Sequence, residues 1–130
     1  MDVKLQQSSF RFLAEHSESM LRVAYDAERY FRNDQETALF KLRKLGEFIA
    51  QNIAERCGIR YDRQTTHHQL MALLARELEL DNKIYDCFDT LRRLGNDAVH
   101  KDKVFTLEEV SRAFEPAWHL AKWFHRTFGK

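Results

Sequence analysis

Helix-breaking residues are scarce in this chain, and this scarcity constrains its fold more than any other feature. The 130 residues include only one proline and four glycines, so the backbone has few places at which a helix must end. Apolar residues also recur every three or four positions over long stretches, which is the spacing of one face of an α-helix. No strand pattern of any weight accompanies them. The sequence therefore predicts an all-α bundle.

The apolar periodicity predicts about five helices in a single domain that covers residues 1–130, a length that fits one hydrophobic core. The approximate bounds of the expected helices are 17–31, 34–57, 65 or 66 to 78, 81–100 and 106–128. The helix over 34–57 is apolar on more than one side, so we expect it at the centre of the bundle. Residues 1–9 look loosely held.

Local signals predict where some of these helices begin and end. Thr106 and Glu109 have the spacing of a capping box, in which each side chain bonds the other residue's backbone N–H. Gly58 is a suitable C-terminal stop for the central helix. Pro116 lies inside the last expected helix, where it removes one backbone hydrogen bond and crowds the preceding turn. We therefore expect a kink near Pro116, or a break into two helices.

The charge balance and the absence of targeting signals exclude several classes of protein. Lys and Arg number 21 against 20 Asp and Glu, so the net charge gives no reason to expect a protein that coats nucleic acid. No stretch approaches the roughly 18 apolar residues of a membrane span, and the first residues lack the apolar run of a secretion signal. Cys57 and Cys87 are far apart and form no Cys-x-x-Cys motif. These features predict a cytoplasmic chain whose reduced thiols act as small hydrophobic groups.

Metal, cofactor and nucleophile motifs are not evident in the sequence. His67 and His68 are adjacent and point in different directions on a helix, and His119 and His125 are six residues apart. No glycine cluster forms a phosphate-binding loop, and no serine or cysteine lies in a pattern typical of a nucleophile. We therefore expect neither a metal site nor a bound cofactor in this domain.

The stretch over 88–100 carries the most specific polar pattern in the chain. Ile84, Phe88, Leu91 and Ala98 share one face of the expected helix, whereas Arg93, Asn96 and His100 face nearly the opposite way. This polar row is either a solvated helix face or a site in which Arg93 binds phosphate and His100 acts as an acid or base. Because Arg93 and His100 are roughly 10 Å apart along the axis, one phosphate would have to bridge them or a second subunit would complete the site.

A second run echoes this one. Leu-Arg-Lys-Leu-Gly-Glu at 42–47 parallels Leu-Arg-Arg-Leu-Gly-Asn at 91–96. Glycine within a helix lowers helix stability by about 1 kcal/mol relative to alanine, so both glycines require an explanation. We hypothesise that the two helices cross closely at Gly46 and Gly95, which would bring Glu47 near Arg93 or Asn96. Replacing either glycine by leucine should then lower the melting temperature. Coincidence in helices rich in Leu and Arg is the alternative.

Four sequence runs together resemble the helical domain at the N-terminus of type I restriction R (motor and nuclease) subunits. These runs are Leu-Arg-Arg-Leu-Gly-Asn-Asp-Ala-Val-His at 91–100, Thr-Ala-Leu-Phe-Lys-Leu-Arg at 37–43 with Gly46-Glu47, Ala-Lys-Trp-Phe-His-Arg at 121–126, and Ser-Phe-Arg-Phe-Leu at 9–13. The resemblance spans about residues 8–130. In such subunits a downstream nuclease domain cleaves DNA, and an ATP-driven helicase pair translocates it. The resemblance thus implies the N-terminal piece of a larger DNA-translocating endonuclease, or a short stand-alone relative, with ATP and Mg bound elsewhere.

This domain type is in turn similar to the HEPN group of helical bundles. Some HEPN proteins are ribonucleases that use an arginine and a histidine a few residues apart, assembled across a dimer. Here six residues separate Arg93 from His100, and Leu94 stands where those nucleases usually carry a polar residue. The resemblance implies a HEPN-like bundle. It leaves open a dimeric ribonuclease with Arg93, Asn96 and His100 as catalytic residues.

The sequence leads to one principal functional hypothesis. The domain is a non-catalytic module that contacts DNA or other domains and subunits of a restriction-modification complex. The candidate contact surface is a local basic cluster formed by Arg92, Arg93, Asn96, His100, Lys101 and Lys103. The alternatives are the homodimeric ribonuclease and a pure assembly domain whose polar row is a helix–helix interface.

Overall fold

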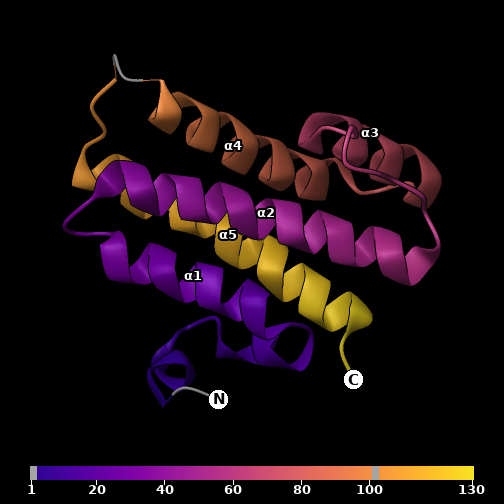
Figure 1. Cartoon of the computed structure of the whole chain (residues 1–130), viewed down its shortest axis with the longest axis horizontal. Helices are drawn as coiled ribbons and strands as arrows, with labels where there is room; N and C mark the ends of the chain where they lie inside the picture. Colours follow the sequence, from indigo (N-terminus) through magenta and orange to yellow (C-terminus); the bar gives the residue numbers. More distant parts are fainter. Residues whose placement is uncertain (1–2, 101–102) are drawn as a thin grey trace.

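The computed structural model describes residues 3–100 and 103–130, and every regular element in this part of the chain is helical (Figure 1). The elements are the 3-10 helices η1 (Val3–Gln7) and η2 (Arg11–Glu15) and the α-helices α1 (Glu18–Tyr30), α2 (Gln35–Cys57), α3 (His67–Leu78), α4 (Asn82–Val99) and α5 (Leu107–Phe128). The predicted all-α bundle is therefore confirmed. None of the helices within the described ranges has the length and hydrophobicity needed to cross a bilayer.

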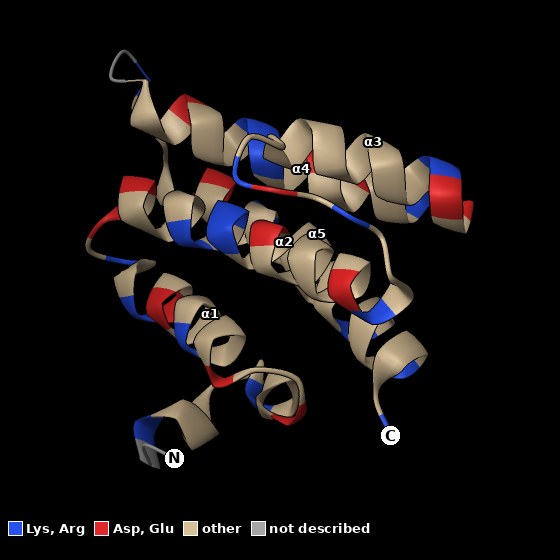
Figure 2. Ribbon diagram, turned by 45° about the vertical axis from the view of Figure 1, so that its right-hand side comes forward, with Lys and Arg blue, Asp and Glu red and all other residues tan. Residues whose placement is uncertain are grey.

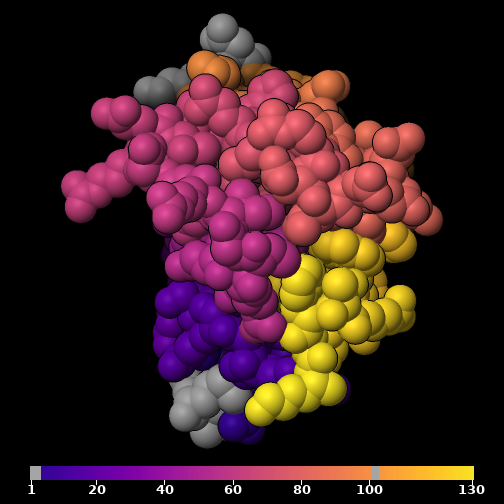
Figure 3. All heavy atoms as spheres, turned by 90° about the vertical axis from the view of Figure 1, so that its right-hand side faces the viewer, coloured from indigo at the N-terminus to yellow at the C-terminus, as the bar shows by residue number. Residues whose placement is uncertain are grey.

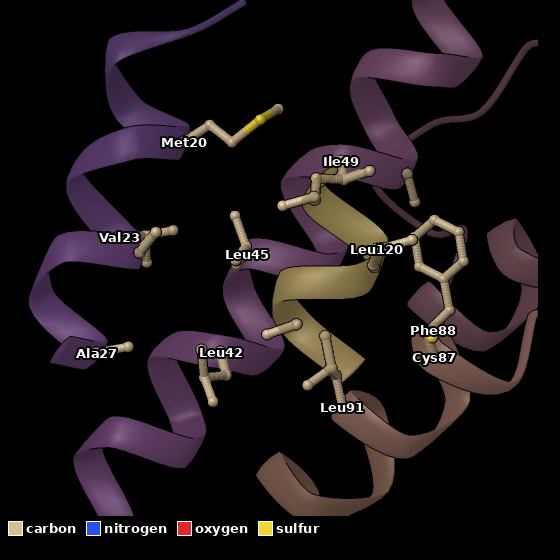
Figure 4. Close-up of a cluster of buried hydrophobic side chains, with 14 of the residues drawn as sticks. Met20, Val23, Ala27, Leu42, Leu45, Ile49, Cys87, Phe88, Leu91 and Leu120 are labelled. Atoms are coloured by element: carbon tan, nitrogen blue, oxygen red, sulfur yellow. The ribbon is translucent and has the colours of Figure 1, made fainter. Parts of the chain in front are cut away.

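The central element of the bundle is α2, which packs against all four of the other α-helices. Its contact with α4 is the most extensive, and α1 covers a different side (Figure 1). Leu42, Leu45 and Ile49 are completely buried along α2. In Figure 4, Met20 of α1 and Leu91 of α4 point toward these side chains from different sides. Full burial of each such side chain stabilises the folded state by about 1.5–3 kcal/mol. The apolar residues of α2 extend around more than one side of the helix, so the central position buries most of them.

Polar side chains cap the start of each α-helix. Each of the five caps accepts a hydrogen bond from a backbone N–H in the first turn; these residues are Ser17, Asp34, Thr66, Asp81 and Thr106. Thr106 and Glu109 form the capping box that their spacing predicts. Gly58 ends α2 with a φ of 69°, a left-handed conformation that glycine adopts without steric cost.

The last helix, α5, continues without interruption across Pro116. The alternative of two separate helices is therefore wrong, whereas a bend within one helix stays a prediction. Pro116 leaves the carbonyl of Arg112 without its usual helical partner. Arg112 is exposed, so water can solvate that carbonyl, and the apolar face of α5 stays buried on both sides of the proline.

The N-terminal segment is more tightly held than its sequence suggests. We expected loose packing over residues 1–9; Met1 and Asp2 lie outside the described residues, but η1 covers most of the rest. Leu5 is completely buried, and the hydroxyl groups of Ser8 and Ser9 both donate to the Glu28 carboxylate of α1. A buried leucine and this charge-assisted pair of bonds together fix the segment against α1.

The two cysteines lie in different environments. Cys87 is buried on α4, and burial raises the pKa of its thiol. Cys57, at the end of α2, is exposed. The expectation that both thiols act as small hydrophobic groups therefore fits Cys87 and is wrong for Cys57, because solvent reaches the last residue of α2.

Candidate functional site

The two predicted faces of α4 are present in the structure. Phe88 and Leu91 are buried against the core, whereas Arg93 and His100 are exposed. The Arg93 side chain is 71% exposed. Asn96, between them, is half-buried. The polar row thus lies on the outside of the bundle, where it is accessible to a partner.

A single carboxylate, that of Asp89, holds both arginines of this face. Its Oδ1 accepts a bond from Nη2 of Arg92 at 2.8 Å, and its Oδ2 lies 2.8 Å from Nε of Arg93. Asp89 and Arg92 are largely buried, with side-chain exposures of 16% and 19%. We did not identify Asp89 as a site residue from the sequence. The signal was its spacing, because residues three and four positions apart face each other on a helix.

This pairing directs Arg93 away from His100. Arg93 extends back by about one turn to reach Asp89, whereas His100 lies roughly two turns further along α4. His100 is the C-terminal cap residue, and its backbone N–H bonds the carbonyl of Asp97. Within one chain, Arg93 and His100 therefore do not converge on one point.

The lysines proposed for the same surface follow α4. Lys101 lies outside the described residues. Lys103 is exposed, and its Nζ lies 4.9 Å from the centre of the buried Phe105 ring. Basic and acidic residues are interspersed along the helices in the view of Figure 2, so the cations of α4 are not part of a large positive field.

The two mid-helix glycines lie at the contact of α2 with α4, but they are not equally crowded. A Cβ placed on Gly95 would lie 2.3 Å from Cβ of Arg43, closer than real Cβ atoms approach. A Cβ placed on Gly46 would lie 3.8 Å from both Nε2 of His67 and Cδ1 of Leu91, an ordinary contact distance. Close approach of the helices therefore requires glycine at position 95, whereas position 46 has room for a methyl group.

Glu47 does not lie beside the arginine or asparagine that we expected. Its carboxylate is 3.3 Å from Nη2 of Arg43, one turn earlier on α2. Arg93 is paired with Asp89 instead. The expected contact of Glu47 with Arg93 or Asn96 is therefore wrong, because each charged group finds its partner within its own helix.

His67 lies at the junction of α2, α3 and α4, in surroundings that keep its ring neutral. Both ring nitrogens are buried and have no hydrogen-bond partner among the described residues, and its ring lies edge-on to Phe88. Burial, followed by the positive charges of Arg43 and Arg92, lowers the pKa of His67 to about 4. From the sequence we considered His67 only as a metal ligand and rejected it; its enclosure could not be predicted, because it depends on how α3 packs.

A groove of about 920 Å³ opens next to this junction, between α2 and the connection that leads into α3. We call it the α2–α3 groove. Arg43, Glu47, Gln51 and Glu55 line it along α2; Ile59, Arg60, Tyr61, Asp62, Arg63, Thr65, Thr66, His67 and Leu70 line it on the other side. In Figure 3 the connection and α3 lie side by side on the end of the bundle. No residue of α4 lines the groove.

A third polar cluster joins the N-terminal turn to the end of α5. Nη2 of Arg56 lies 2.9 Å from Nδ1 of His16, and Nε2 of His16 lies 2.9 Å from Nδ1 of His125. Because Arg56 can only donate, His16 accepts at Nδ1 and donates from Nε2 to His125. Burial, and then the Arg56 charge, lower the pKa of His16.

Glu15, His16 and His125 place three potential metal-ligand atoms within 4.8 Å of one another. A metal ion on Nε2 of His16 would require a proton on Nδ1, where Arg56 already donates. It would also lie close to the Arg56 cation. The cluster therefore fits a structural link between η2 and α5 better than a metal centre.

Comparison with known families assigns most of this structure to one domain type. The family described as "Domain of unknown function (DUF4145)" matches residues 25–124. The chain belongs to this family. The residues matched by the DUF4145 family include all of α4 and the whole α2–α3 groove. His16 and His125 lie outside the matched residues. No solved structure matches the chain.

The chain is also similar to a restriction protein. It is 29% identical over 126 residues to the type I restriction enzyme EcoKI endonuclease subunit of Escherichia coli (strain K12). This match covers 97% of the chain but only 10% of that subunit. The DUF4145 domain described here is thus related to a type I restriction endonuclease subunit, as its sequence runs predicted, and it spans about a tenth of the length of that relative.

Proposed function

We propose that this domain is a non-catalytic module of a type I restriction R-type polypeptide, and that the outer face of α4 contacts the DNA backbone. We use "outer face of α4" for Arg93, Asn96 and His100, together with the largely buried Arg92 and with Lys103, which follows the helix. The observation that carries the proposal is the contact between Arg93 and Asp89, which are 2.8 Å apart. It turns the arginine away from His100, so one chain offers a binding surface and not an acid–base site.

The same contact prepares Arg93 to bind a phosphate. Asp89 engages Nε, and the side chain is 71% exposed, so its terminal amino groups face solvent. A guanidinium that is already oriented loses less conformational freedom when it binds phosphate, and it can donate two parallel hydrogen bonds. Lys103, four residues beyond the end of α4, is a second exposed cation. ATP and Mg²⁺ would be bound by other domains of such a polypeptide.

Fluorescence anisotropy with a labelled DNA duplex tests this contact. We expect weak, salt-sensitive binding, in which each lost phosphate contact lowers the slope of log K against log salt by about 0.9. Arg93→Gln should reduce affinity at low salt and lower that slope by about 0.9, the change expected for one lost phosphate contact. The matched control is Arg22→Gln on α1, because Arg22 is also exposed and also pairs with a carboxylate on its own helix.

Two results would contradict the DNA contact. One is the absence of duplex binding by the wild-type domain at low salt. The other is an equal loss of affinity in Arg93→Gln and Arg22→Gln, which would reveal only a general effect of net charge. Either result would direct attention to contacts between the outer face of α4 and other restriction components.

A further inference from the structure

We propose that the α2–α3 groove binds an extended polypeptide segment that carries both a basic and an acidic side chain. The groove and the outer face of α4 have no lining residue in common, so this proposal does not depend on DNA binding by α4. Its support comes from the shape of the groove, the distribution of charge on its two walls, and the unpaired amide at its centre.

The α2 wall of the groove is a row of polar side chains. Arg43, Glu47, Gln51 and Glu55 recur every four residues, so they form one oblique row along the helix. From Arg43 to Glu55 this row extends about 18 Å, at the rise of 1.5 Å per residue of an α-helix. An extended chain advances about 3.3 Å per residue, so five or six residues, roughly, would fill this length.

The two walls carry opposite charge. Glu55 is exposed on the α2 wall, whereas Arg60 and Arg63 are exposed on the facing connection. The carboxylate of Asp62 accepts the backbone N–H groups of Gln64 and Thr65, so it is already engaged within the connection. A basic side chain of a ligand would therefore meet Glu55, and an acidic one would meet Arg60 or Arg63.

This charge pattern favours a polypeptide over a nucleic acid. A phosphate backbone that approached Arg60 and Arg63 would also meet the carboxylates of Glu47 and Glu55 across the groove. Like charges brought together at an interface are unfavourable and exclude the wrong partner. A zwitterionic peptide satisfies both walls.

Gln51 lies at the middle of the row and suits a peptide backbone. It is half-buried, and its side chain makes no hydrogen bond with any of the described residues. A carboxamide offers one acceptor and two donor hydrogens, so it can bond the C=O and the N–H of a peptide group together. Tyr61, half-buried on the facing wall, adds a hydroxyl group.

The experiment is a selection of random peptides, long enough to fill the groove, displayed on phage and panned against the complete chain. Enriched peptides are then synthesised, and their affinities are measured by anisotropy for the wild type and for Glu55→Lys. The charge-matched control is Glu77→Lys on α3, because Glu77 is also an exposed helical glutamate but lies outside the groove. Amide chemical shifts of the labelled domain locate the bound peptide.

We expect enriched peptides that contain basic and acidic residues and that shift the amides of Gln51, Tyr61 and Thr65. Glu55→Lys should weaken their binding by about five- to tenfold, and Glu77→Lys should leave it unchanged. A single-stranded DNA of about five nucleotides, roughly as long as the groove at about 3.4 Å per nucleotide, serves as the competing probe. Tighter binding of this DNA than of every enriched peptide in the wild-type groove would overturn the proposal in favour of nucleic acid. No enriched peptide, or shifts that map elsewhere, would also overturn it.

Discussion

Two of the regions in which an arginine and a histidine occur together differ in enclosure. On the outer face of α4, Arg93 and His100 are exposed and point apart. At the junction of α2, α3 and α4, Arg43 and His67 are packed among buried side chains, and polar atoms of both are closed off from solvent. Packing holds the enclosed pair in place and lowers the pKa of His67, whereas the open pair remains accessible to a partner.

The largest expected effect concerns the packing that encloses the junction. Gly95→Ala should lower the free energy of unfolding by about 1–3 kcal/mol, because the new Cβ would overlap with Arg43. Gly46→Ala should be neutral or stabilise the domain by up to about 1 kcal/mol, because alanine favours helix and the site has room. Urea denaturation measures both. Equal destabilisation by the two substitutions would show that the helices are equally close at both glycines.

The second effect is a pH dependence that arises from His67. Its folded pKa of about 4 lies below that of an unfolded histidine, so only the unfolded chain takes up this proton at mildly acidic pH. The resulting stability is fully present above about pH 6.5 and is lost as the pH falls toward 4. Between about pH 7 and 5, His67 should account for a loss of about 1–2 kcal/mol in the free energy of unfolding.

Urea titrations at both pH values measure this loss in the wild type and in His67→Gln, which cannot titrate there. The variant should show the smaller loss of stability. His68→Gln is the control, because His68 is the exposed neighbour. The pKa of His16 is also lowered, but His16 is present in all three proteins. Its contribution to the pH dependence of stability therefore cancels in the comparison. An unchanged pH dependence in His67→Gln would contradict the enclosure of His67.

A smaller effect should follow from loss of the carboxylate that orients the outer face of α4. Asp89→Asn should lower the free energy of unfolding by about 1 kcal/mol, because two charge-assisted bonds at 2.8 Å weaken. Asp26→Asn is the control, because Asp26 has similar exposure but its partners lie at 3.4 and 3.9 Å. Thermal melts that give equal losses would argue against a special role for Asp89.

The sequence predicted those parts of the structure that depend on local signals. Thr106 with Glu109, and Gly58, marked helix ends correctly because a cap acts within one turn. The α4 faces followed from periodicity alone. The position of α2 followed from its apolar residues, which extend around more than one side.

Contacts that depend on packing were not predictable in the same way. The burial of His67 requires α3 to fold back against α2 and α4, and no local pattern encodes that arrangement. The bond from Ser8 to Glu28 spans 20 residues. Asp89 is a partial exception, because its spacing from Arg92 and Arg93 was visible in the sequence. Which carboxylate pairs with each arginine could be determined only in the structure.

The central claim is that the open pair on α4 forms no active site. Its most direct test is incubation of single-stranded RNA with the wild-type domain, His100→Ala and Arg93→Gln at equal concentration, over a range of protein concentrations that would populate a dimer. We expect the same background cleavage in all three proteins, because Asp89 holds Arg93 away from His100. Cleavage that rises with wild-type concentration and is lost in both variants would contradict it.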